Sequence, residues 1–244
     1  MNSYNYDLHI HSCLSPCGDD DMTPANIAGM AALKGLNVVA LTDHNTSKNC
    51  PAFFAQAKKH GLIPVPGMEL TTSEDIHVIC IFPTLELAMD FDGYVGQRRV
   101  RVRNRSEIFG NQFIMNESDE ICGEEPDLLI NGTTIDLETA YSEVTRRGGA
   151  CYPAHVDRES NGMIAVLGDM PDSPVYQAFE LNDKNSLGTY LERYPRLRGK
   201  RYIVSSDAHY LWNISEAGQT LTLDDEPYSS QKVRESLIGY LRGE

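Results

Sequence analysis

The 244-residue sequence predicts an α/β protein, a distorted seven-stranded (β/α) barrel of the TIM-like kind. Short β-branched runs alternate with helix-like segments, which favours a parallel sheet. Polar residues follow the ends of at least five of these runs, and a closed barrel lets five strand ends converge, whereas an open sheet gathers its site between two or three. With 41% hydrophobic residues and no Gly-, Pro- or Ser-rich linker, we expect one domain over residues 1–244.

The first part of the chain contains four predicted strands and two predicted helices. Thr23-Pro24 marks a helix start, with Thr as N-cap and Pro at the first helical position. Gly35 and Gly61 mark the two helix ends. The expected strands cover residues 6–11, 37–41, 62–69 and 76–82, and the expected helices cover residues 25–34 and 51–59.

Residues 84–127, approximately, are polar and show no regular period, which predicts an irregular insertion in the barrel. Its arginine cluster, Arg98 to Arg105, is expected to be a solvated face rather than a phosphate-binding site. Alternation then resumes, with expected helices at residues 136–147, 186–193 and 229–241 and expected strands at residues 149–153, 175–181 and 201–205.

Charge and composition restrict the partners. The formal net charge of -14 argues against a long nucleic-acid duplex, because binding to its backbone relies on Lys and Arg. The chain has no apolar stretch near 18 residues and no charged-then-apolar leader, so we expect no membrane partner and a cytoplasmic location. The six cysteines are dispersed, which favours reduced thiols.

Histidines mark the strand ends. Six of the seven lie at or just past a β-branched run, and the opening Asp7-Leu8-His9-Ile10-His11 places two imidazoles on one side of a strand. Imidazole and carboxylate donors with little thiolate suit Zn²⁺, Mn²⁺ or Fe²⁺. The donors exceed what one ion needs, so two or three ions are predicted. They are His9, His11, His44, Glu69, His77, His155, Asp207 and His209.

The chain lacks the sequence motifs of several other catalytic classes. The chain has no Gly-x-Ser-x-Gly turn, no phosphate-binding Gly-x-x-x-x-Gly-Lys loop and no Gly-x-Gly-x-x-Gly turn. Clustered divalent ions would instead activate water and neutralise phosphoryl charge, which are the two requirements of phosphoester hydrolysis.

Six motifs occur in a characteristic order and spacing: Asp7-Leu8-His9-Ile10-His11, Thr42-Asp43-His44, Gly67-Met68-Glu69, His77, Pro153-Ala154-His155 and Ser206-Asp207-Ala208-His209. In this order and approximate spacing the chain resembles the polymerase and histidinol phosphatase (PHP) family over nearly its whole length. The resemblance implies a distorted seven-stranded barrel with up to three metals at the strand ends, acting on phosphoesters.

The resemblance also implies ligand sets. One ion would be held by His9, His11, Glu69 and Asp207, and a second would share Glu69 and add His77 and His155. His44 and His209 would hold a third ion together with a residue of the loop after His11.

The last ligand of the third ion stays open between Cys17 and one of Asp19 to Asp21. Family patterns place Asp or His in this loop, whereas this chain has Cys17 and the run Asp19-Asp20-Asp21. By spacing from His11, Cys17 matches the His version. Counted back from Thr23-Pro24, Asp19 matches the Asp version.

These features predict a phosphoesterase that hydrolyses a nucleotide, a short oligonucleotide or a histidinol-phosphate-like monoester with hydroxide generated at the metals. Asp207 and His209 are expected to take part in catalysis, and Arg158 to clamp the phosphate. Asp7 and Asp43 are expected to support neighbouring ligands by hydrogen bonds. Two alternatives remain: a metal-dependent amidohydrolase on the same barrel, and a non-catalytic metal-binding regulatory module.

Overall fold

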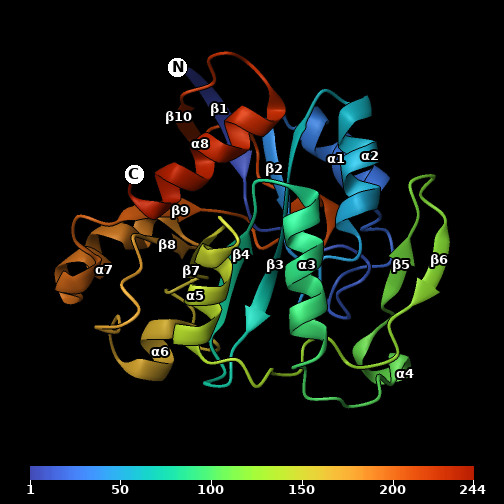
Figure 1. Cartoon of the computed structure of the whole chain (residues 1–244), viewed down its shortest axis with the longest axis horizontal. Coiled ribbons are helices and arrows are strands. Elements are labelled where there is room, and N and C mark those ends of the chain that lie inside the picture. The colour runs from blue at the N-terminus through green and yellow to red at the C-terminus, as the bar shows by residue number, and fades with distance from the viewer.

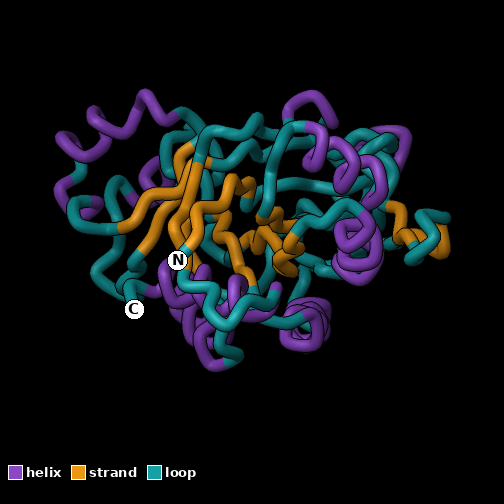
Figure 2. The backbone as a smooth tube through the Cα atoms, turned by 90° about the horizontal axis from the view of Figure 1, so that it is seen from above, coloured by secondary structure: helices purple, strands orange, loops and turns teal.

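A curled six-stranded sheet in the order β10-β1-β2-β3-β4-β7 forms the centre of the computed structural model, which describes residues 1–244. Helices lie around the outside of the strands (Figures 1 and 2). The strands of this sheet are β1 (Asn2–Asp7), β2 (Val38–Leu41), β3 (Ile63–Thr71), β4 (His77–Ile81), β7 (Ala150–Pro153) and β10 (Thr220–Leu223). Two further pairs are β5 (Phe113–Met115) with β6 (Ile121–Glu124), and β8 (Ala178–Leu181) with β9 (Arg201–Val204).

The sheet curls into an incomplete barrel. The pair β8–β9 lies between β7 and the chain after β1, where the Val156 N–H donates to the Glu180 carbonyl (2.9 Å) and the His11 N–H donates to the Ala208 carbonyl (3.0 Å). These are single links, and neither joins β8 or β9 to the six-stranded sheet by a ladder. The predicted α/β class is therefore confirmed, whereas the closed (β/α)₇ arrangement of seven strands is not.

Strand β4 departs most from a parallel barrel. It pairs antiparallel with both β3 and β7, because only residues 72–76 separate it from β3 and a parallel crossover needs a dozen or more residues. His77 consequently stands at the first residue of its strand instead of the last. The reversal still brings it to the edge where the other ligands lie, with His77 opposite Thr71.

Five helices follow the predicted segments to within one or two residues. Thr23, Asp136 and Ser229 each accept a backbone N–H at a helix start, as N-caps do. The helices are α1 (Pro24–Leu33), α2 (Cys50–Lys59), α5 (Leu137–Arg146), α7 (Leu187–Arg193) and α8 (Ser230–Arg242).

The segment expected to be irregular contains regular structure. Helix α3 (Leu85–Gly96) is capped by Thr84 and buries Ala88, Phe91 and Val95 at helical spacing. Its apolar face packs against the sheet, so burial rather than the polar composition of the segment determines its structure. The remaining short elements are α4 (Ser106–Phe109), α6 (Met163–Leu167) and the 3₁₀ turns η1 (Lys184–Ser186), η2 (Pro195–Leu197) and η3 (Leu211–Asn213).

Side chains along a strand alternate between the two faces of the sheet, so the strands contribute to two apolar clusters, an inner one and an outer one under the helices. On β4, Ile79 and Ile81 join the inner cluster, while Val78 and Cys80 join the cluster under α3 and α5. Helix α8 covers the opposite end of the sheet from His77, and its Arg234 Nη1 donates to the Pro64 carbonyl at the start of β3 (3.4 Å). No helix has the length and apolar character needed to cross a membrane.

Candidate metal centre

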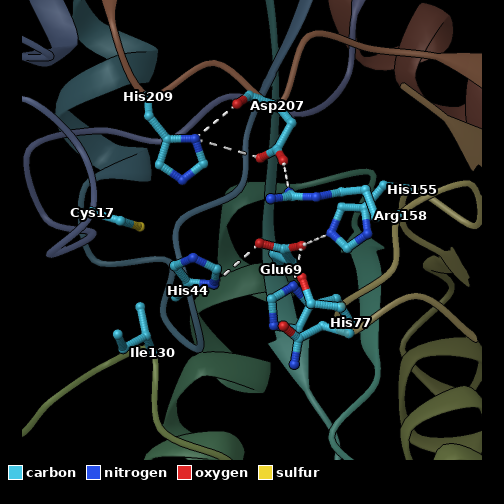
Figure 3. A pocket seen from close by; sticks show the side chains of 11 residues that line it. Cys17, His44, Glu69, His77, Ile130, His155, Arg158, Asp207 and His209 are labelled. Carbon is cyan, nitrogen blue, oxygen red and sulfur yellow. Dashed lines mark hydrogen bonds and ion pairs between the residues drawn. The ribbon is translucent and has the colours of Figure 1, made fainter. Parts of the chain in front are cut away.

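The polar strand ends converge on Glu69, a carboxylate on β3 that is 1% exposed. Its Oε1 lies 2.7 Å from His77 Nδ1 and 2.9 Å from His155 Nε2. Figure 3 shows Glu69 between His44, His77 and His155. The other oxygen, Oε2, lies 3.1 Å from His44 Nδ1, 3.3 Å from His11 Nε2 and 3.4 Å from His9 Nε2.

All eight predicted donors therefore lie in one cluster. The His155 ring lies beside Glu69 but belongs to none of the donor groups below. His44 belongs to two of these groups. Three groups of donor atoms could each hold an ion: His9, His11, Glu69 and Asp207; His44, Glu69 and His77; and His11, His44 and His209. The first group is identical to the predicted set for one ion, and the other two overlap the predicted sets.

Hydrogen bonds orient three of the imidazoles toward the centre. The Nδ1–H of His9 donates to Glu180 Oε1 (2.8 Å), that of His209 donates to the Asp207 carbonyl (2.8 Å), and that of His11 donates to Ser15 Oγ (3.0 Å). Each bond leaves a bare Nε2 as the available ligand atom. The Nε2 atoms of His9 and His11 are only 3.1 Å apart, the arrangement expected of two ligands of one ion.

Several buried polar atoms in this cluster have no hydrogen-bond partner. They include Nδ1 of His44, Nδ1 of His77 and Oδ1 of Asp207. The two ring nitrogens lie near Glu69 but without hydrogen-bond geometry. An unpaired buried polar group costs about 1–3 kcal/mol. Cations held by the first two donor groups would satisfy these three atoms, one group containing Asp207 and the other His44 and His77. The residues thus fit divalent metal ions.

The protonation states of the cluster follow from its own charges. Burial raises the pKa of Glu69 and of Asp207, but the imidazoles, His77 and His9 foremost, outweigh it and hold both pKa values below the usual range. Burial lowers the pKa of His9 and of His11, but the neighbouring carboxylates outweigh it and raise both pKa values, that of His11 to about 9. Burial and the neighbouring His11 lower the pKa of His209 to about 4. A cation that binds here would therefore find ionised carboxylates and a neutral His209, and it would displace protons from His9 and His11.

The loop after β1 presents Cys17 to the cavity. The Cys17 side chain projects toward the site in Figure 3, and it lines the cavity together with His44 and His209. Asp19 Oδ1 instead accepts the Asp21 N–H (2.9 Å), and Asp20 Oδ2 accepts from Asn111 Nδ2 (2.8 Å). Of the candidates that the sequence left open, Cys17 is the one positioned at the cavity.

The cavity itself has a volume of about 280 Å³ and is lined mainly by the candidate ligands. Arg158, which follows the end of β7, reaches across it to Asp207, with Nη1 2.5 Å from Oδ2 (Figure 3). Its side chain remains 44% exposed. The predicted phosphate-binding arginine therefore lies at the cavity mouth beside the donor cluster.

Asp7 and Asp43 hydrogen-bond to the segments that carry the ligands. Asp7 accepts the backbone N–H of His9 (3.4 Å) and those of Ser206 (3.1 Å) and Ser215 (3.0 Å), which holds the loop around Asp207. Asp43 accepts the Ser15 hydroxyl (2.7 Å), and Ser15 in turn accepts from His11. Asp7 therefore holds the backbone of one ligand directly, and Asp43 acts on a ligand ring through Ser15.

Sequence reasoning missed Glu180. This residue of β8 is fully buried, and its Oε1 holds the His9 ring and also accepts the His155 N–H (3.2 Å). The available signal was an acid within the apolar run Ala178-Phe179-Glu180-Leu181, because a fully buried acid is rare without a partner.

Comparison with known proteins supports the family resemblance. Residues 7–95 match the model of the PHP domain. The resemblance inferred from the ordered motifs is thereby confirmed over this part of the chain.

Two relatives match the chain by sequence over part of its length. A 5'-3' exoribonuclease of Haemophilus influenzae is 34% identical over 77 residues, which are 30% of this chain and 27% of that protein. An uncharacterised protein of Methanocaldococcus jannaschii is 38% identical over 76 residues, which are 28% of this chain and 44% of that protein. The match thus spans less than half of either relative.

Solved structures share the fold of the chain. Endonuclease Q of Pyrococcus furiosus has a TM-score of 0.66 at 18% identity, covering 99% of this chain and 56% of its own. A suspected metal-dependent phosphoesterase of Bifidobacterium adolescentis has a TM-score of 0.55 at 20% identity, covering 95% of both chains. An amidohydrolase of Chromobacterium violaceum, with bound sulfate, has a TM-score of 0.58 at 17% identity, covering 90% of this chain and 92% of its own.

The expectation that excluded a long duplex from the partners is wrong. Endonuclease Q in complex with a 27-mer duplex, an abasic lesion at its active site, has a TM-score of 0.61 at 19% identity and covers 98% of this chain and 57% of its own. A protein that contains this fold therefore binds duplex DNA. Net charge is a sum over the whole chain, whereas duplex binding depends on the charge along the path of the backbone.

Proposed function

We propose that this chain is a metal-dependent phosphoesterase. The observation that carries the proposal is the single carboxylate of Glu69 facing five imidazoles, with Asp207 completing the cluster. Divalent ions bound there would make a water nucleophilic near neutral pH and neutralise charge on a phosphoryl group.

The ligand sets are proposed as follows. His9, His11, Glu69 and Asp207 hold one ion, and Glu69, His77 and His155 hold a second. A third ion takes His44 and His209, with Cys17 as the candidate that the cavity favours over Asp19.

The remaining roles belong to groups at the cavity mouth. Arg158 forms an ion pair with Asp207 and is exposed enough to turn its guanidinium toward a phosphate oxygen, where two N–H groups can bind in parallel. Asp207 and His209 stand on one turn beside it and are proposed to orient the attacking water and the oxygen of the leaving group.

Nucleotide phosphoesters are the favoured substrates. The exoribonuclease relative and the endonuclease of the same fold both act on nucleic acids by name, which supports a nucleotide-containing ester over a histidinol-phosphate-like monoester. A single domain of the full chain, with residues 84–127 as part of it, is proposed as the active unit.

The proposal is tested by assaying p-nitrophenyl phosphate and bis(p-nitrophenyl) phosphate with Mn²⁺ or Zn²⁺, before and after chelation. We expect turnover that chelation abolishes and added metal restores. Glu69→Gln should remove it, while Glu86→Gln, at an exposed acid of α3, should not. Absence of metal-dependent turnover on a broad panel of phosphoesters would refute the proposal.

An amidohydrolase is the second candidate, because a protein of this name shares the fold and because activated water attacks carbonyl carbon as well as phosphorus. Product analysis with amide and carboxylic ester substrates separates the two. Release of amine without any phosphoester turnover would favour the amidohydrolase.

A further inference from the structure

A second cavity adjoins the metal centre. It lies between α6, α7 and the chain that follows β7, and its volume is about 670 Å³. Arg158 lines both this cavity and the one over the donor cluster. We name it the α6–α7 cavity. A ligand whose phosphate contacts Arg158 in the first cavity can therefore extend into the second.

The sizes of the two cavities suggest that each binds a different part of the substrate. The cavity over the donors, about 280 Å³, is lined largely by metal ligands and suits ions and a phosphoryl group. The α6–α7 cavity falls within the range of about 300–1,000 Å³ that small-molecule sites occupy. The larger space is where an organic substituent of the phosphate would fit.

The walls of the α6–α7 cavity are suited to a nucleoside. Tyr190 and Tyr194 of this wall have ring centroids 5.5 Å apart, and Val156 and Ile164 add buried apolar surface. Stacking of bases on aromatic side chains contributes to the binding of single-stranded nucleic acids without requiring a particular base. The lining thus offers stacking surface for a base.

Charged groups of the same wall are available to a ligand. Arg193 forms no ion pair, and its guanidinium lies 5.3 Å from the Tyr194 ring centroid. Two of the three acids are already engaged: Asp157 accepts the N–H groups of Asn182 and Asp183 (2.9 Å each), and Asp169 accepts the Met170 N–H (2.8 Å). Arg193 is therefore the donor of this wall that remains for the sugar of a nucleoside.

We propose that the α6–α7 cavity is a subsite for the nucleoside attached to the scissile phosphate, with Tyr190 stacking on the base and Arg193 donating to the oxygens of the sugar. The inference rests on the proposed phosphoesterase function and specifies its substrate class: esters that carry a nucleoside beside the reacting phosphorus. Neither residue touches the donor cluster, so both act on substrate binding alone.

The test compares two phosphodiesters that release the same p-nitrophenolate, methyl p-nitrophenyl phosphate and thymidine 5'-(p-nitrophenyl phosphate). The wild-type metal-loaded protein should show a kcat/KM about tenfold or more higher for the thymidine ester, in line with about 1–3 kcal/mol per stacked base. Tyr190→Ala and Arg193→Ala should each remove most of this preference. Tyr190→Phe keeps the ring and should retain it.

The matched control is Arg146→Ala, which removes an exposed arginine of α5 that lines neither cavity and pairs only with Glu143. It should leave the ratio of the two kcat/KM values unchanged. Equal kcat/KM values for the two esters in the wild type, or an equal loss on both esters in the Tyr190 and Arg193 variants, would overturn the subsite.

Failure of the phosphoesterase proposal can be distinguished from failure of the subsite. If neither ester is hydrolysed, calorimetric titration of the metal-loaded protein with thymidine 5'-monophosphate and with inorganic phosphate decides the question. Tighter binding of the nucleotide, weakened by Arg193→Ala without change for phosphate, supports the subsite. Equal affinities for the two ligands overturn it.

Discussion

At the scale of single residues, the site depends on how Glu69 uses its two oxygens. Oε1 faces His77 and His155, and Oε2 faces His9, His11 and His44. A buried acid surrounded in this way is stable only with positive charge nearby. The backbone near it is also constrained, since His155 and Asp207 adopt φ values of 27° and 51°, which non-glycine residues seldom do.

Glu180→Gln should weaken metal binding while the protein stays folded. The carboxylate of Glu180 accepts the His9 Nδ1–H, and such supporting bonds raise the basicity of the ligand and fix its ring. We expect the metal affinity to fall about 10–100-fold, measured by competition with a chelating dye. Glu124→Gln, at an exposed acid of β6, is the control. An unchanged affinity for Glu180→Gln would contradict this role.

Cys17→Ser should lower the number of ions bound per chain if Cys17 completes the third ligand set. Its thiol faces the cavity, whereas the Asp19 side chain is engaged with the Asp21 backbone. Elemental analysis of the metal-saturated protein measures the change, with Cys122→Ser at an exposed cysteine as control. If Asp19→Asn lowers the metal content and Cys17→Ser does not, the assignment is reversed.

At the scale of elements, the hairpin of β3 and β4 brings Glu69 and His77 together. Gly67, two residues before Glu69, lies where the neighbouring strand approaches closely, because a Cβ there would stand 2.5 Å from the Cys80 carbonyl oxygen. The glycine is therefore required by packing between strands rather than by a special φ value.

Gly67→Ala should destabilise the fold by about 1–3 kcal/mol, the usual cost of overpacking a core. Gly93→Ala is a control of the opposite sign, since Gly93 lies in α3 with no atom within 4 Å of an added Cβ. It should stabilise the helix by about 0.5–1 kcal/mol. Urea unfolding of both variants measures the two free energies. If Gly67→Ala has the same free energy of unfolding as the wild type, then β3 and β4 can move apart at Gly67 without cost.

At the scale of the whole molecule, the metal centre joins segments that are far apart in the chain. Its candidate donors come from the chain after β1 and after β2, from β3, from β4 and from the chain after β7 and β9. Bound ions would link these segments in the folded state only.

The net charge is also a property of the whole molecule. It gave a wrong expectation about duplex partners, because a total charge carries no information about where the charge lies.

Chelation should therefore lower Tm. Ligand at 100 times its Kd stabilises the folded state by about 2.7 kcal/mol, and about 1 kcal/mol shifts Tm by roughly 2–4 °C in a protein of this size. Differential scanning calorimetry with saturating metal and with chelator should thus show a difference of roughly 5–10 °C. Glu69→Gln should show a smaller metal dependence. Identical Tm values for the wild type would exclude stabilising ions.

The sequence by itself determined the α/β class, five helices, and the identity and order of the eight donors. These depend on local features: N-caps such as Thr23 and Asp136, glycine stops, and strand-end histidines. Helix α3 was within reach of the same reasoning, since Thr84 and the spacing of Ala88, Phe91 and Val95 carry a helix signal.

Only the tertiary structure decided the direction of β4, the position of Cys17 rather than Asp19 at the cavity, and the support of His9 by Glu180. Each of these depends on the distance between side chains that the sequence separates widely, such as the 171 positions between His9 and Glu180. Residue types and their spacing show which donors a chain possesses. The curl of the sheet determines which of them meet, because packing and strand pairing bring remote strand ends to one edge.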